Sequence, residues 1–199
     1  MIEITILLAP LAAAFIAGVF QRFLGDRVAM AITTGSVCLA AALSIYTFVQ
    51  YVFMGAPAHT IELFPFIDVA GFKSVWSVRI DTLSVVMLVV VTGVSSLVHI
   101  YSIGYMADDP HRARFFSYLS FFTFSMLMLV TSANFLQLFF GWEGVGVASY
   151  LLIGFWYQKR SANDAAIKAF VVNRVGDFGF ALGIFLVFVL TGSVAFDAI

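Results

Sequence analysis

Apolar residues fill six long stretches of the chain, and short polar segments separate them. A helix needs roughly 20 apolar residues to cross the hydrocarbon core of a bilayer. Six windows approach or exceed this length: residues 2–20, 28–54, 82–106, 115–131, 135–157 and 165–190, the last with several polar residues. The pattern predicts an all-α polytopic membrane protein with six transmembrane helices, in which residues 1–199 form a single transmembrane domain.

The longest connection, residues 55–81, does not follow the helical pattern. Its segments 59–64 and 75–80 partly alternate apolar and polar residues, as strands do, and the turn-prone residues 70–73 lie between them. The sequence therefore predicts a small extracytoplasmic β-hairpin between the second and third helices, lying on the membrane surface.

Basic residues are distributed unevenly between the loops. The loops after the first, third and fifth windows hold Arg22 and Arg27, Arg112 and Arg114, and Lys159 and Arg160. The loops on the other side hold only Lys73 and Arg79. Because short loops rich in Lys and Arg stay in the cytoplasm, we expect the N-terminus outside. Acidic Glu3 before the first apolar stretch favours a mature helix over a cleaved signal peptide.

Composition supports the membrane class and excludes several kinds of site. Hydrophobic residues make up 62% of the 199 and charged residues only 11%, which no water-soluble fold of this size can accommodate. A net charge of −1 gives no reason to expect nucleic acid as a partner. The single cysteine, Cys38, excludes a disulfide framework and a cysteine-based metal site. Because dinucleotide and phosphate loops and paired haem histidines are also missing, we expect no cofactor, metal or redox centre in this chain.

Glu143 is an acidic residue deep within the fifth window. It lies eight residues after Phe135, about 12 Å along a helix. No basic residue lies within a helical turn of it, so its partner must come from another helix, or the carboxyl is protonated. Gly146, on the same stripe as Tyr150, lets water or another backbone approach. An ionisable group at this depth indicates a proton relay, and the alternative is a glutamic acid hydrogen-bonded to a neighbouring helix as structural support.

The sixth window holds three further ionisable residues. Arg174 and Asp177 are three residues apart and can pair on one helix, either as a structural ion pair or as a switch beside Glu143. Lys168 follows Asp164 by four residues, so an ion pair near the membrane interface is its simpler interpretation. Small residues on another face favour close packing of helices; they are Gly176, Gly179 and Gly183.

His99 lies toward the end of the third window, and Tyr101 and Tyr105 follow it. A lone histidine at such a position is more often part of a structural hydrogen-bond network than a proton relay. Its imidazole can exchange protons near neutral pH, so both interpretations stay open.

Several stretches resemble the antiporter-like subunits of respiratory complex I. The most specific is NFLQLFFGWEGVGVASYLLIGFW at residues 134–156, and residues 79–84, 99–106 and 165–177 resemble the large distal member of that family. The resemblance covers nearly the whole chain. It implies that Glu143 is the family's essential intramembrane glutamate, and that Arg174 and Asp177 form an ion pair that modulates it near a neighbouring subunit. It also implies that Lys168 is a retained basic position.

The resemblance also implies a function and partners. The function is proton translocation coupled to quinone reduction elsewhere in an NADH–quinone oxidoreductase, whose other subunits carry FMN and iron–sulfur clusters. The expected partners are the other membrane-arm subunits, above all the neighbouring antiporter-like subunit, and the lipid bilayer of a bacterial plasma membrane rather than a mitochondrial inner membrane. The alternatives are the large subunit of a multi-subunit cation/proton antiporter, a subunit of a membrane-bound hydrogenase, and a scaffold that does not pump.

The chain departs from the family in length. Family members place a lysine on a broken seventh helix opposite the glutamate, and the 199 residues contain no such helix. We therefore expect the N-terminal part of the antiporter-like fold, and no complete proton path within this chain alone.

Overall fold

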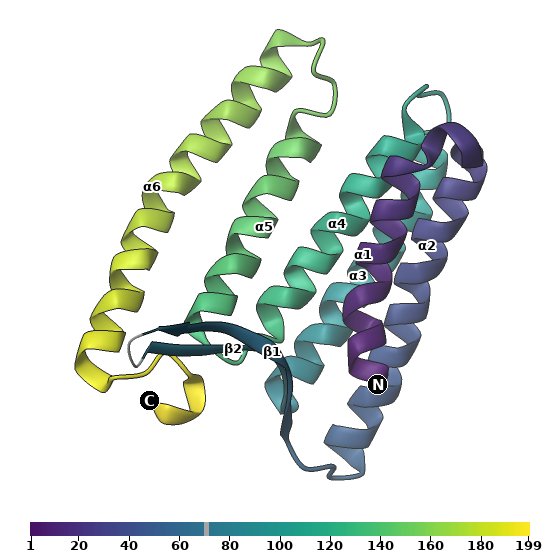
Figure 1. Cartoon of the computed structure of the whole chain (residues 1–199). Helices are drawn as coiled ribbons and strands as arrows, with labels where there is room; N and C mark the ends of the chain where they lie inside the picture. Colours follow the sequence, from purple (N-terminus) through teal and green to yellow (C-terminus); the bar gives the residue numbers. More distant parts are fainter. Residues whose placement is uncertain (70–71) are drawn as a thin grey trace.

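Six long helices lie side by side in the computed structural model, which describes residues 1–69 and 72–199 (Figure 1). They are α1 (Ile2–Val19), α2 (Gln21–Phe48), α3 (Thr82–Tyr105), α4 (Arg112–Val130), α5 (Phe135–Ile153) and α6 (Arg160–Thr191). Within the described residues, six helices are long and apolar enough to cross a membrane, α2 together with the segment that continues it. The predicted all-α membrane fold with six spanning helices is confirmed.

The second and sixth helices begin earlier than their apolar windows. α2 starts at Gln21, and Gly25, with φ 72°, interrupts its helical backbone. After Phe48 it continues as a π-helical segment, Val49–Phe53. α6 has 32 residues and is about 48 Å long, more than a bilayer core requires, so its polar first turns extend beyond the apolar window. Hydropathy marks where a helix is apolar and contains no information on kinks or polar ends.

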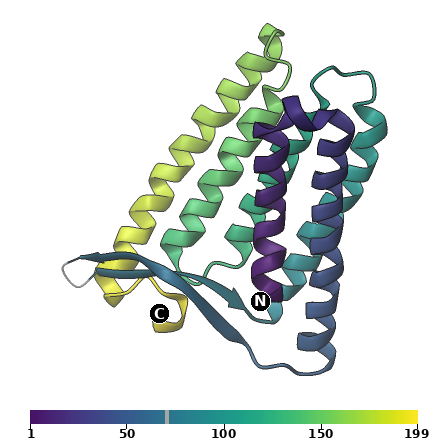
Figure 2. The same cartoon turned by 45° about the vertical axis from the view of Figure 1, so that its right-hand side comes forward.

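The two strands between α2 and α3 form an antiparallel hairpin, as predicted. They are β1 (His59–Val69) and β2 (Phe72–Ile80), both longer than the predicted segments. Of the predicted turn, Ala70 and Gly71 lie outside the described residues, and the other two residues belong to β2. The hairpin crosses one end of the bundle, from α2 toward α6, at the end where both termini lie (Figures 1 and 2).

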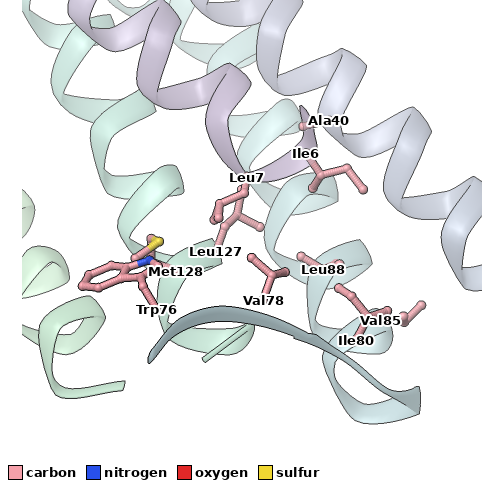
Figure 3. Close-up of a cluster of buried hydrophobic side chains, with 10 residues drawn as sticks. All are labelled: Ile6, Leu7, Ala40, Trp76, Val78, Ile80, Val85, Leu88, Leu127 and Met128. Carbon is pink, nitrogen blue, oxygen red and sulfur yellow. The ribbon is translucent and has the colours of Figure 1, made fainter. Parts of the chain in front are cut away.

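One face of β2 is packed against the helices. Trp76, Val78 and Ile80 alternate along the strand, so their side chains point to the same side. They belong to a buried cluster with residues from four helices: Ile6, Leu7, Ala40, Val85, Leu88, Leu127 and Met128 (Figure 3). β2 is therefore part of the core, whereas most residues of β1 are exposed.

Two polar side chains at the start of α5 attach β2 to the helices. The Asn134 side chain accepts a hydrogen bond from the Gln137 N–H (2.8 Å), which caps α5, and donates one to the Val75 carbonyl (2.8 Å). Oε1 of Gln137 accepts a hydrogen bond from the Ser77 N–H (3.0 Å). Each side chain satisfies backbone groups that would otherwise be buried without a partner.

The segment that follows α6 packs against the start of α5. The Phe135 N–H donates to the Val194 carbonyl (3.0 Å), and the Phe196 N–H donates to the Ala133 carbonyl (3.1 Å). The ring of Phe188, near the end of α6, packs edge-on against the ring of Phe72 on β2, with centroids 4.8 Å apart. The end of α6 is thus held against both the start of α5 and the hairpin.

Arg79 joins three elements at this end of the bundle. Its Nε lies 3.1 Å from Oδ2 of Asp81, and its Nη1 lies 2.7 Å from Oδ1 of Asp197, which follows α6. Asp81 also caps α3 by accepting the Ser84 N–H (2.8 Å). Burial alone would raise the pKa of Asp81, but the hydrogen bonds from Ser84 and Arg79 outweigh it and hold that pKa below its usual value.

Gly141 permits the close approach of α4 and α5. A Cβ at this position would lie 2.7 Å from both the Cα and the N of Leu129, and a helix backbone cannot move aside as a flexible side chain can. We expect Gly141→Ala to force the helices apart and to lower the stability of the assembled protein by about 3 kcal/mol, measured as thermal unfolding in detergent. Gly35→Ala is the control, because its Cβ meets no atom of the described residues within 4 Å. Equal stabilities of the two variants would contradict the tight contact.

Candidate functional site

Glu143 lies on α5 with its side chain mostly buried, 21% exposed. Its partner comes from the neighbouring helix: Nη1 of Arg174, on α6, donates a short hydrogen bond to Oε1 of Glu143. Since α5 carries no basic residue near Glu143, this contact depends on how α5 and α6 are aligned. The pair lies well inside both apolar helices, away from either helix end.

Arg174 faces a second carboxylate as well. Its Nη1 lies 3.8 Å from Oδ2 of Asp177, so the predicted pair on one helix is present but longer than the contact with Glu143. The guanidinium also lies over the ring of Phe170, with 4.8 Å between Cζ and the ring centroid. With 49% of its side chain exposed, Arg174 has room to turn between its two acidic neighbours.

Trp142 completes the contacts between the two helices. Its indole Nε1–H donates a hydrogen bond of 2.9 Å to Oδ1 of Asp177, whose side chain is buried. Trp142 was not among the site residues predicted from the sequence. The available signal was an indole N–H at membrane depth beside Glu143, because an indole N–H away from water requires an acceptor.

Two acids and the cation that they share form a compact ionisable group: Glu143, Asp177 and Arg174. When both carboxyls are ionised the group carries one net negative charge. Taking up a single proton makes the group neutral, and a neutral group costs less in a medium of low dielectric constant. The arrangement is chemically suited to binding and releasing one proton.

A cavity of about 300 Å³ reaches Glu143 from the side of α4. Phe121, Phe124 and Ser125 of α4 line it together with Gly144 of α5. The volume accommodates several water molecules, although the wall is almost entirely apolar. Ser125 offers one of the few polar atoms, and its hydroxyl donates to the Phe121 carbonyl (3.0 Å).

Lys168 does not join this group. It is exposed on α6, six residues before Arg174 or about 9 Å along the helix. The pair expected between Lys168 and Asp164 is not formed; Asp164 lies instead 3.9 Å from Arg160, also four residues away. That prediction was wrong because α6 begins earlier than its apolar window and so provides a second basic partner.

His99 is fully buried between α3 and α4 and is separate from Glu143. Its Nδ1 lies 2.8 Å from the Ser95 carbonyl and its Nε2 lies 3.1 Å from the Ser120 hydroxyl. A carbonyl only accepts, so Nδ1 carries a proton, while the Ser120 hydroxyl can donate to or accept from Nε2. The arrangement ties α3 to α4 through the imidazole.

The three glycines of α6 have no close neighbour from another element among the described residues. A Cβ at Gly176, Gly179 or Gly183 would meet no atom of the described residues within 4 Å. The close packing predicted for this face is therefore not formed within the described part of the chain. The described residues also contain no cluster of three or more His, Cys, Asp or Glu side chains suited to a metal ion.

Two family models match the chain. One, NADH-ubiquinone oxidoreductase (complex I) chain 5 N-terminus, matches residues 66–116. The other, the transmembrane region of NADH:quinone oxidoreductase/Mrp antiporter, matches residues 132–199 and so includes Glu143, Arg174 and Asp177.

Curated relatives match nearly the whole chain. The NADH-quinone oxidoreductase subunit L of Rhodobacter capsulatus is 56% identical over 203 residues, which cover 98% of this chain and 28% of that protein. The NADH-ubiquinone oxidoreductase chain 5 of Marchantia polymorpha is 54% identical over 194 residues, covering 98% of this chain and 29% of that protein. The chain therefore spans less than a third of the length of these relatives.

A solved structure has the same fold. A chain of the membrane-bound sulfane sulfur reductase, an archaeal respiratory membrane complex, aligns with a TM-score of 0.76 over 96% of this chain and 28% of its own length, at 19% identity. Similarity at this identity concerns the fold alone. The sequence relatives and both family models lead to one conclusion: the chain belongs to the family of antiporter-like complex I subunits that comprises NADH-quinone oxidoreductase subunit L and NADH-ubiquinone oxidoreductase chain 5.

Proposed function

We propose that this chain forms part of a proton-translocating subunit in the membrane arm of an NADH–quinone oxidoreductase. The observation that carries the proposal is the single guanidinium of Arg174 shared between the carboxylates of Glu143 and Asp177 inside two apolar helices. Ionisable groups at membrane depth are costly, and they commonly belong to ion or proton pathways. The names and high identities of the relatives support the same function.

The mechanism that we propose is an exchange of the cation between the two acids. When Arg174 turns toward Asp177, Glu143 loses its counter-charge and binds a proton, because an unpaired carboxylate is costly in hydrocarbon. When Arg174 returns to Glu143, the ionised carboxylate is favoured and the proton leaves. Charge changes that originate from quinone reduction elsewhere in the complex would drive this exchange, and the group that receives the proton lies outside this chain.

The proposed orientation places the hairpin outside the cytoplasm. The N-terminus and the hairpin lie at one end of the bundle (Figure 1), and the loops with paired basic residues lie at the other. Under the rule that basic loops stay inside, the hairpin end faces the periplasm of a bacterial plasma membrane. The proposed partners are the neighbouring membrane-arm subunits, with FMN and iron–sulfur clusters in other chains and quinone bound elsewhere.

Purification of the intact assembly tests this function directly. We expect the assembly that contains this chain, isolated from native membranes, to include flavin and iron–sulfur proteins and to support NADH-driven proton uptake in vesicles. A cation/proton antiporter is the second candidate, because the model that matches residues 132–199 covers both kinds of protein. Sodium-dependent proton flux without flavin or iron–sulfur proteins would refute the oxidoreductase function.

A further inference from the structure

Arg114, near the start of α4, is a half-buried cation with most of its donors unused. Its Nη2 donates to the Phe155 carbonyl (3.1 Å), while its Nε is buried and has no hydrogen-bond partner among the described residues. None of the described carboxylates lies within 4.0 Å of it. The Nε of the neighbouring Arg112 is likewise buried without a partner among these residues, but Arg112 has a counter-charge, since its Nη2 lies 3.5 Å from Asp26. A guanidinium has five N–H donors, so Arg114 can bind an additional acceptor.

A cavity of about 210 Å³ adjoins this guanidinium, and it is called the Arg114 pocket here. Three helices provide further donors to its wall: Tyr118 from α4, Tyr150 from α5 and Asn163 from α6. The Asn163 amide already donates to the Tyr157 carbonyl (2.6 Å) and keeps a second N–H. No carboxylate lines the pocket among the described residues. A cation surrounded by hydroxyl and amide groups, without an acid, is suited to an anion.

A second cavity of about 210 Å³ also reaches Arg114, but it is less suitable because Asp109 lines it. The Asp109 carboxylate accepts hydrogen bonds from the Trp156 indole (2.9 Å) and the His111 N–H (2.7 Å). Burial alone would raise the pKa of Asp109, but these hydrogen bonds and nearby positive charge hold that pKa below its usual value. The ionised acid repels an anion there, so the Arg114 pocket is the site of choice.

The surroundings of the pocket are those of a membrane interface. The Arg114 guanidinium lies 4.8 Å from the Phe155 ring centroid and 5.2 Å from that of Tyr157, and Lys159 lies 5.0 Å from that of Trp156. Aromatic rings mixed with basic side chains at helix ends are typical of the headgroup region. Apolar residues next to the lining residues of α5 and α6 are exposed; Ile153 and Ile167 are examples.

We propose that the Arg114 pocket binds the phosphate of an anionic phospholipid, with the acyl chains lying against the exposed apolar residues of α5 and α6. The guanidinium, the two tyrosine hydroxyls and the asparagine amide supply the donors. A zwitterionic lipid is a poorer ligand, because no carboxylate lines the pocket to receive its ammonium group. Basic pockets between transmembrane helices are known to select anionic headgroups.

Photolabelling of the intact complex tests this site. The complex is placed in phosphatidylcholine nanodiscs that contain a small amount of a headgroup-diazirine analogue, either of phosphatidylglycerol or of phosphatidylcholine. We expect the phosphatidylglycerol analogue to label peptides from residues 109–118 and 150–166 about five-fold more than the phosphatidylcholine analogue. Arg114→Gln should bring this ratio close to one. Arg112→Gln is the matched control on the same helix and should leave the ratio unchanged, because Arg112 already faces Asp26.

A second variant and three contrary outcomes complete the photolabelling experiment. If Arg114→Gln fails to assemble, Tyr118→Phe removes one donor with little change in volume and should still lower the ratio. Equal labelling by both analogues in the unmodified complex would overturn the proposal, as would loss of the preference on addition of excess inorganic phosphate, which would indicate a site for free anions. Crosslinking of these peptides to another protein segment instead of lipid would also overturn it.

Discussion

Replacing Glu143 with Gln is expected to reduce proton translocation by the intact complex about ten-fold or more, while the complex still assembles. Glutamine has nearly the same volume and can still accept the hydrogen bond from Arg174. It cannot take up and release a proton in the physiological range, so the exchange between the two acids is interrupted. The measurement is NADH-driven proton uptake in inverted vesicles, normalised to the amount of assembled complex.

The matched control is another carboxylate in the same chain. Glu62 lies on β1 with its side chain exposed, and Glu62→Gln should leave proton uptake unchanged. Wild-type uptake by the Glu143→Gln complex would remove Glu143 from the pathway. It would favour a scaffold in which the glutamic acid only ties α5 to α6.

Arg174→Gln is expected to lower the rate of proton uptake by the intact complex several-fold. Glu143 and Asp177 share the Arg174 guanidinium, so its removal leaves two carboxyls inside apolar helices without a counter-charge. The proposed exchange of the cation between the two acids then stops. The measurement is the initial rate of NADH-driven proton uptake, normalised to the amount of assembled complex.

Two variants separate this effect from general damage to α6. Arg174→Lys keeps the positive charge and should restore much of the original rate, although it loses the planar guanidinium that reaches two carboxylates. Arg160→Gln lies on the same helix, where Arg160 is exposed and pairs with Asp164, and should behave as wild type. An unchanged rate in Arg174→Gln would show that Arg174 does not act on Glu143.

The fold could be predicted in outline because the apolar character of its long segments dominates it. Long apolar runs require helices in a membrane, and the alternating segments before Ile80 required strands. The sequence pattern did not reveal the break at Gly25 or the π-helical segment that follows Phe48. Nor did it show that Asn134 and Gln137 bind a strand about 60 residues earlier, because hydrogen bonds between distant segments have no signature in local hydropathy.

The site could be predicted only as far as individual residues go. The depth of Glu143 in its helix and the spacing of Arg174 and Asp177 both follow from the sequence. The contact between Arg174 and Glu143 does not, because it depends on the alignment of α5 with α6. The same alignment brings Trp142 to Asp177. The alignment of α5 with α6 results from how the two helices pack, and the residue spacing within either helix does not predict it.

α6 is attached to the start of α5 and to the hairpin at one end, and it also contacts α5 along its length, for example through the rings of Tyr150 and Phe170. Arg174 lies 17 residues before Thr191, about 26 Å along the helix from the attached end. A tilt of about 5° at that end would displace Arg174 by about 2 Å, which is enough to break its hydrogen bond to Glu143. A small angular change where α6 meets the hairpin would thus become a larger displacement where the two acids share their cation.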